Sequence, residues 1–140
     1  MPMCLTINKN YQKIPARLEF TDEKKTHFYA YKALTRNYNG AIVSPYRHKK
    51  FTKGYNKSNR AKIELASDEK VPDCRNYGVV YRGIHVFLRK SDVTKSYCST
   101  LYVKVKCALK DVVAFGTYGQ TKSAVLMKVF ISKSEWDKAI

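Results

Sequence analysis

The sequence is organised around the stretch Val79-Val-Tyr-Arg-Gly-Ile-His-Val-Phe-Leu88. Its odd positions place Val79, Tyr81, His85 and Phe87 on one face of an extended chain, and its even positions place Val80, Ile84, Val86 and Leu88 on the other. This period of two predicts a β-strand that turns an apolar face inward. Gly83 lies in the middle of the run, where a glycine indicates a bulge or a close approach of another backbone.

Further apolar runs on both sides of this stretch predict short strands. They are 3–7 as an edge strand, 27–34, 41–43, 100–107, 112–115 and 123–131. In 100–107 the alternation is strict, with Leu101, Val103, Val105 and Cys107 inward and Tyr102, Lys104 and Lys106 outward. The core side of 123–131 is predicted to be Val125, Met127, Val129 and Ile131. Asn37-Tyr-Asn-Gly40 predicts a tight turn that returns 41–43 antiparallel, because Asn-Gly tolerates positive φ.

Two serines mark short helices. Ser91 is a suitable N-cap, with Asp92 favoured in the first turn by the helix dipole, and a helical turn is predicted to follow through Tyr97. Ser134 is predicted to cap a last helical turn through Trp136. The pattern therefore predicts an α+β fold. We expect one compact domain over residues 1–140, with a mostly antiparallel sheet of five or six short strands and one or two short helices.

Charge is the unusual property of the chain. There are 27 Lys and Arg against 11 Asp and Glu, a formal net charge of +16. The span from Lys24 to Ile63 is rich in lysine and arginine and contains no acid. Its dense part is predicted to be a basic loop or arm at about 44–62, because Gly54, Asn56 and Ser58 break any regular period. A field of this sign favours polyanionic partners.

Aromatic residues are threaded between these bases, which suggests a nucleic-acid site. Lysine and arginine bind phosphates, and tyrosine and phenylalanine stack on unpaired bases. The predicted binding residues are Tyr46, Arg47, Lys49, Lys50, Phe51, Lys53, Tyr55, Lys57, Arg60 and Lys62. The alternative is that the arm docks on an acidic protein surface, as in a small structural protein of a capsid or another assembly. The sequence leaves DNA, RNA and protein partners open.

No catalytic motif supports an enzyme. The chain lacks G-x-x-x-x-G-K, H-E-x-x-H and G-x-S-x-G, and its four cysteines form no C-x-x-C pair. We therefore expect no catalytic residue, metal or cofactor. Tyr81, His85 and Phe87 remain a possible ligand pocket, with a packed, hydrogen-bonded histidine as the alternative. No apolar run is long enough to cross a bilayer as a helix, so we expect no membrane span, and we expect an intracellular or virion location rather than secretion.

Several short motifs occur in an order that is similar to a known group of proteins. They are Met3-Cys4-Leu5, Tyr31-Lys32-Ala33-Leu34, Ser44-Pro45-Tyr46, Gly83-Ile84-His85-Val86-Phe87 and Val112-Val-Ala-Phe-Gly116. This order resembles a loosely defined family of small uncharacterised proteins from large DNA viruses, bacteriophages and some bacteria. The resemblance covers most of the chain and implies a viral or phage accessory protein. The family brings no established activity, and the basic segment of this chain is heavier than the family pattern.

A second resemblance is to the core of ADP-ribosyltransferases. There a Gly-Ile-His stretch comes before a short helix and a valine-rich strand. The resemblance implies that His85 or Tyr81 faces a nicotinamide and that an acid late in the chain completes the site, for which Glu135 is the available glutamate. An ADP-ribosyltransferase-like enzyme is accordingly the third functional alternative. It rests on fold-level analogy.

Overall fold

The computed structural model describes residues 5–44, 49–58, 61–65, 78–96, 101–118 and 121–139. Within these ranges the chain forms β1 (Leu5–Ile7), β2 (His27–Arg36), β3 (Ile42–Val43), β4 (Gly54–Lys57), β5 (Lys62–Leu65), β6 (Gly78–Tyr81), β7 (Ile84–Phe87), α1 (Lys90–Ser96), β8 (Leu101–Ala108), the 3₁₀ turn η2 (Leu109–Asp111), β9 (Val112–Tyr118), β10 (Thr121–Leu126), β11 (Lys128–Ile131) and α2 (Lys133–Ala139). The predicted α+β class with five or six strands is therefore wrong. The described residues form a mostly β fold of eleven strands and two seven-residue helices.

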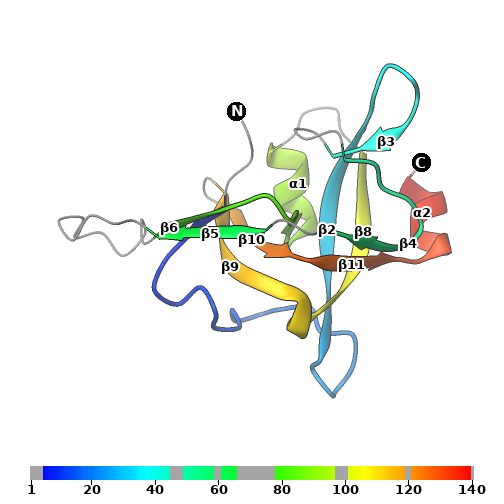
Figure 1. Cartoon of the computed structure of the whole chain (residues 1–140). Coiled ribbons are helices and arrows are strands. Elements are labelled where there is room, and N and C mark those ends of the chain that lie inside the picture. The colour runs from blue at the N-terminus through cyan, green and yellow to red at the C-terminus, as the bar shows by residue number, and fades with distance from the viewer. Residues whose placement is uncertain are drawn as a thin grey trace.

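The strands form one antiparallel sheet in the order β4-β11-β8-β2-β7-β10-β9-β1-β6-β5, with β3 beside β2. Its longest pairing is the ribbon of β2 and β8, whose register runs from His27–Ala108 to Leu34–Leu101. This ribbon crosses the run of β10 and β11 at a steep angle (Figure 1). The sheet is therefore bent where the ribbon meets its neighbours, at Tyr31–Phe87 and at Lys106–Phe130.

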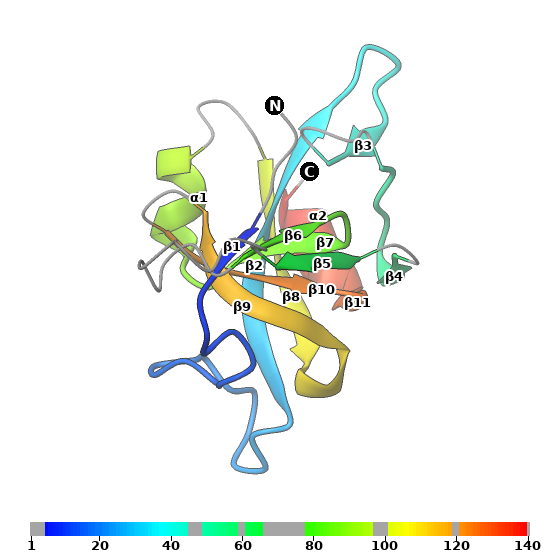
Figure 2. The ribbon, with the colours of Figure 1, turned by 60° about the vertical axis from the view of Figure 1, so that its left-hand side comes forward.

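The sheet curls until its two ends come close together. β4 and β5 stand at opposite ends of the strand order, yet only residues 58–61 separate Lys57 from Lys62 in the chain. A connection of this length spans at most roughly 18 Å. The backbone N–H of Ser58 also donates to the carbonyl oxygen of Met127 at 2.8 Å, between β10 and β11. The result is a curled half-barrel (Figure 2).

The stretch from Val79 to Leu88 is two strands rather than the single strand that its alternation predicts. Arg82 and Gly83 have φ values of 62° and 77°, and the chain turns a corner there. β6 consequently pairs with β1 and β5, whereas β7 pairs with β2 and β10. A Cβ atom on Gly83 would lie 2.5 Å from Cγ1 of Val125, so the close neighbour of this glycine is a side chain rather than the backbone that the sequence predicted.

The last predicted strand, 123–131, is also divided. β10 ends at Leu126 and pairs with β7 and β9, while β11 begins at Lys128 and pairs with β4 and β8. Val125 consequently packs in a small cluster with β1, apart from Val129 and Ile131 in the main core. Met127, between the two strands, is half-buried. The prediction that these residues share one continuous core side is wrong, because the chain bends at Met127.

The main core lies on the inner face of the β2–β8 ribbon. Its buried members include Phe28, Leu34, Ile84, Val86, Val103, Val105, Leu126, Val129 and Ile131. Trp136 and Ala139 of α2 pack against this core, and Val93 of α1 packs on Ala33 and Phe87 in a separate cluster. In the β2–β8 register, alternate residues point to opposite faces. The ribbon therefore has a buried side and a side that is covered only in part by α1.

Several local predictions are confirmed. Residues 37–40 form the turn that joins β2 to β3, with Gly40 at a φ of 80°. The Oδ1 atom of Asn37 accepts hydrogen bonds from the N–H groups of Asn39 and Ala41, both at 3.0 Å. The strand from 100 to 107 exists as β8, with Val103, Val105 and Cys107 buried as predicted.

Two predictions about strands are wrong. β1 is not an edge strand, because it lies between β9 and β6. The basic segment at about 44–62 is not one loop, because Gly54–Lys57 forms β4 on β11 and β5 begins at Lys62.

The predicted helix caps are wrong as well. α1 begins at Lys90, so Ser91 lies inside its first turn, and Tyr97, the predicted end of this helix, lies outside the described residues. α2 begins at Lys133, and the N–H of Glu135 donates to Oγ of Ser132 at 3.2 Å. Ser132 rather than Ser134 is therefore the cap of the last helix.

Candidate nucleic-acid interface

The site begins with the alternation of β8. Val103, Val105 and Cys107 are buried, so the intervening Tyr102 and Lys104, which are half-buried, and Lys106, which is exposed, point to the outer face. Burial raises the pKa of the Cys107 thiol far above its usual value. The outer residues remain accessible to a partner. β8 spans roughly 23 Å at about 3.3 Å per residue, which sets the length of this face.

Strand register extends the outer face across four neighbouring strands. Tyr55 of β4 lies opposite Phe130 of β11, Phe130 lies opposite Lys106 of β8, and Lys106 lies opposite Tyr29 of β2. Directly opposed residues of antiparallel strands point to the same face. These four side chains therefore form one row across the sheet. Tyr55 is 63% exposed and its ring centroid is 4.9 Å from that of Phe130.

Lysines lie over the tyrosine rings of this face. The Nζ atom of Lys104 is 4.2 Å from the ring centroid of Tyr29, and that of Lys128 is 4.4 Å from the ring centroid of Tyr55. Such cation–π contacts place an ammonium group over the face of an aromatic ring. We call the outer residues Tyr29, Tyr31, Tyr55, Tyr102, Phe130, Lys104, Lys106 and Lys128 the aromatic–lysine face.

Three adjoining hollows form a groove along this face. The first, about 130 Å³, lies between His27, Tyr55 and Lys128, and it shares Lys106 and Phe130 with the second, about 220 Å³. The second shares Lys104 and Glu135 with the third, about 480 Å³. Among the described residues that line the groove, lysines outnumber carboxylates. The lysines are Lys90, Lys104, Lys106, Lys110, Lys128 and Lys138, and the carboxylates are Asp111 and Glu135.

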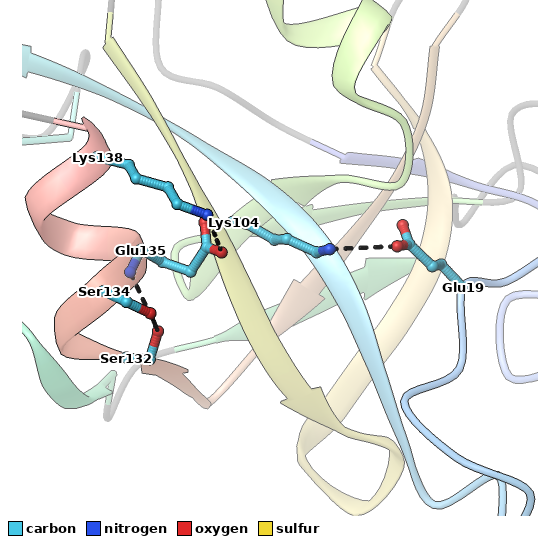
Figure 3. A network of polar contacts seen from close by, with 6 residues as sticks. All are labelled: Glu19, Lys104, Ser132, Ser134, Glu135 and Lys138. Carbon is cyan, nitrogen blue, oxygen red and sulfur yellow. Dashed lines mark hydrogen bonds and ion pairs between the residues drawn. The ribbon is translucent and has the colours of Figure 1, made fainter.

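Glu19, in the loop before β2, contacts two residues that line the groove. Its carboxylate accepts a hydrogen bond from the hydroxyl of Tyr31 at 3.2 Å and pairs with Nζ of Lys104 at 3.4 Å. Figure 3 shows Lys104 extending across β2 toward Glu19. Burial, followed by the Glu19 charge, raises the pKa of Tyr31. Burial acts against the charge of Lys104, but the charge and hydrogen bond of Glu19, together with the charges of Tyr31 and Glu135, raise the pKa of Lys104 overall.

α2 supplies the far end of the groove. Glu135 pairs with Lys138 at 3.5 Å between Oε1 and Nζ. Figure 3 shows both side chains leaning toward β8, beside Lys104. On the other side of the groove, Nζ of Lys90 lies 5.5 Å from the ring centroid of Tyr102. A hydrogen bond to the Tyr102 hydroxyl raises the pKa of Lys90, so this lysine is charged at neutral pH.

The predicted binding residues that the structure describes lie on several different elements. Tyr55 and Lys57 both point to the exposed side of β4, with buried Asn56 between them. They join the aromatic–lysine face, where Lys57 lies opposite Lys128. Lys62 lies on β5, opposite Tyr81, and lines none of the three hollows. Lys50 and Lys53 are exposed, and Nζ of Lys49 donates to the carbonyl oxygen of Lys57. Tyr46, Arg47 and Arg60 lie outside the described residues.

Phe51 cannot stack on a base. It is 6% exposed, belongs to the main core, and its N–H donates to the carbonyl oxygen of Ile42 at 3.0 Å. The sequence placed it among the binding residues because it stands between lysines. Its burial is a tertiary effect, since residues 50–51 fold back on β3.

Tyr81, His85 and Phe87 line none of the three hollows of the groove. The corner at Gly83 leaves Tyr81 on β6, opposite Lys62, and places the other two on β7. His85 is 5% exposed and lies opposite Val125, and Phe87 is 1% exposed and packs against Tyr118. Glu135, the acid required by the transferase analogy, lines hollows whose walls include neither Tyr81 nor His85.

Sequence reasoning missed Tyr29, Tyr31, Lys128 and Phe130 as site residues. The detectable signal was the outward set of β8, Tyr102, Lys104 and Lys106, which carries both rings and charges. The sequence did not show which strands pair with β8. Those partners are β2, which precedes the basic segment, and β11, which lies near the C-terminus, so spacing along the chain does not reveal them.

Comparison with protein-family models, with curated proteins and with solved structures found no match. Among the described residues, no three His, Cys, Asp or Glu side chains gather closely enough to hold a metal ion. Neither of the two described helices has the length and apolar character that crossing a bilayer requires.

Proposed function

We propose that this protein binds single-stranded nucleic acid along the aromatic–lysine face. The observation that carries the proposal is the row Tyr55–Phe130–Lys106–Tyr29, in which three rings and an ammonium group lie across four strands. Sheet faces with exposed aromatic side chains stack unpaired bases, and lysines beside them meet the phosphates. The family resemblance adds a role as an accessory protein of a virus or phage.

Charge and shape support a nucleic-acid strand over an acidic protein. An acidic protein partner would pair with the cations and could also bury Tyr55, whose ring is exposed and lies beneath Lys128. A nucleotide uses both, because its base has a π-face for the ring and its phosphate pairs with the lysine. The groove also follows β8, so a single strand can lie along it and meet successive rings and lysines.

Tyr55 provides the sharpest test. We expect Tyr55→Ala to weaken binding of a single-stranded oligonucleotide by about 1–3 kcal/mol and to affect duplex binding much less, since duplex bases are already stacked. Tyr38→Ala is the matched control, because Tyr38 is 97% exposed in the β2–β3 turn, away from the groove. Fluorescence anisotropy with labelled strands and duplexes measures both effects.

Two results would count against the proposal. One is the absence of measurable affinity for single-stranded DNA or RNA at about 50 mM salt, where phosphate contacts are strong. The other is a stoichiometric complex with an acidic protein that survives nuclease treatment and loses affinity equally in Tyr55→Ala and Tyr38→Ala. The second result would favour docking in an assembly.

A further inference from the structure

The largest hollow of the groove differs from the other two in its lining. It lies between α1 and α2, with a volume of about 480 Å³, within the roughly 300–1,000 Å³ typical of small-molecule sites. Tyr31 and Tyr102, with ring centroids 6.5 Å apart in an edge-to-face arrangement, form an aromatic wall. Leu101, Val103 and Ala139 add apolar surface. A flat aromatic ligand matches this wall.

Three lysines and one carboxylate lie around that apolar surface. Lys90 and Lys104 come from one side and Lys138 from α2, while the carboxylate of Glu135 also belongs to the lining. A phosphate seated beside Glu135 would be repelled, whereas the three lysines can hold phosphates that flank the hollow. The hollow thus suits a base, and its surrounding lysines suit the backbone of the same strand.

We infer that this hollow receives one base of the bound strand and that Glu135 selects a base with an exocyclic amino group. This inference rests on the proposed function. An ionised carboxylate only accepts hydrogen bonds, so it pairs with the amino groups of cytosine, adenine or guanine. Thymine offers carbonyl oxygens on either side of a single N–H, and these oxygens face the carboxylate unfavourably.

The local structure holds Glu135 in place for this role. Its N–H is capped by Oγ of Ser132 at 3.2 Å, and its Oε1 pairs with Lys138 at 3.5 Å. Figure 3 shows the side chain projecting from α2 toward β8, where Lys104 begins. A carboxylate on a capped helix beside a lysine keeps its direction better than one on a loop, which is what discrimination between bases requires.

The test compares a ten-nucleotide oligo-dT with the same strand carrying one central dC. For the unmodified protein we expect about 5- to 150-fold tighter binding of the dC strand, the range of one good side-chain–base pair. Glu135→Gln should abolish or reverse this preference, because the amide can donate to the thymine carbonyl. Asp137→Asn is the matched control. This substitution also removes one negative charge from α2. Asp137 pairs with Lys133 and does not line the hollow, so the preference for the dC strand should remain.

Other results overturn the inference. Equal binding of both strands by the unmodified protein would refute base selection and leave the proposed function intact. A uniform gain in affinity for both strands, equal in Glu135→Gln and Asp137→Asn, would show that Glu135 acts only through its charge. Failure of every strand to bind would refute the proposed function itself, and the inference with it.

Discussion

Lys32 of β2 lies directly opposite Val103 of β8, and both side chains point into the hydrophobic core. Lys32 is 4% exposed, and its Nζ atom is 5.5 Å from the ring centroid of Phe51. Desolvation lowers the pKa of Lys32 to about 8. A lysine among Ala30, Leu34 and Phe51 therefore costs the folded state stability whenever it carries its charge.

Replacing this lysine should stabilise the protein at neutral pH. The folded state holds the Lys32 proton less tightly than the unfolded state, so the penalty is complete below the folded pKa of about 8. It is relieved as the pH rises from there toward the unfolded value of 10.5. We expect Lys32→Met to gain on the order of 2–4 kcal/mol at pH 7 and to lose most of that gain by pH 10. Urea unfolding at several pH values measures it, and a gain independent of pH would contradict the assigned cause.

The same register predicts a difference between two core substitutions. Val103 and Val105 are equally buried, but Val103 lies opposite Lys32 and Val105 lies opposite Ala30. Val105→Asp should unfold the domain, because it buries an unpaired charge. In Val103→Asp the new carboxylate faces the Lys32 ammonium and should cost less. Thermal melts measure both, and the difference should vanish when each change is combined with Lys32→Met.

A side chain at residue 83, in the corner between β6 and β7, should destabilise the fold more than one at residue 40. Gly83 and Gly40 share a positive φ, 77° and 80°, but a Cβ on Gly83 would meet Val125, whereas Gly40 has open space. Gly40→Ala should cost about 1–2 kcal/mol for its backbone conformation alone. Gly83→Ala should cost about 1–3 kcal/mol more, through overpacking. Equal losses in denaturant unfolding would mean that the corner adjusts without strain.

Salt dependence should locate the phosphate contacts. If Lys104, Lys106 and Lys128 each meet a phosphate, changing all three to Gln should make the slope of log affinity against log salt shallower by about 2 for a single strand. The control changes Lys9, Lys13 and Lys24 to Gln, which removes equal charge from exposed positions before β2. An equal change of slope in both triple variants would indicate a diffuse field rather than a defined groove.

Local features of this protein could be predicted from the chain alone. The alternation of β8, the turn at residues 37–40 and the irregularity at Gly83 depend on the side-chain period of extended chains and on the φ range of glycine, which act between neighbouring residues. The positive charge is likewise a property of composition. For these features no partner strand is needed, which is why the sequence was sufficient.

Which residues share a surface depends instead on how the strands pair. Pairing sets Tyr55, Phe130, Lys106 and Tyr29 in one row, although Tyr29 and Phe130 are far apart in the chain. The same folding buries Phe51, which the charge pattern had assigned to the binding surface. The register of each strand is set by which residues the whole sheet buries. At Gly83 and Met127 the chain bends and gains new partner strands, although the alternation of apolar residues continues through both bends. A groove made by four strands therefore exists only once these non-local contacts have formed.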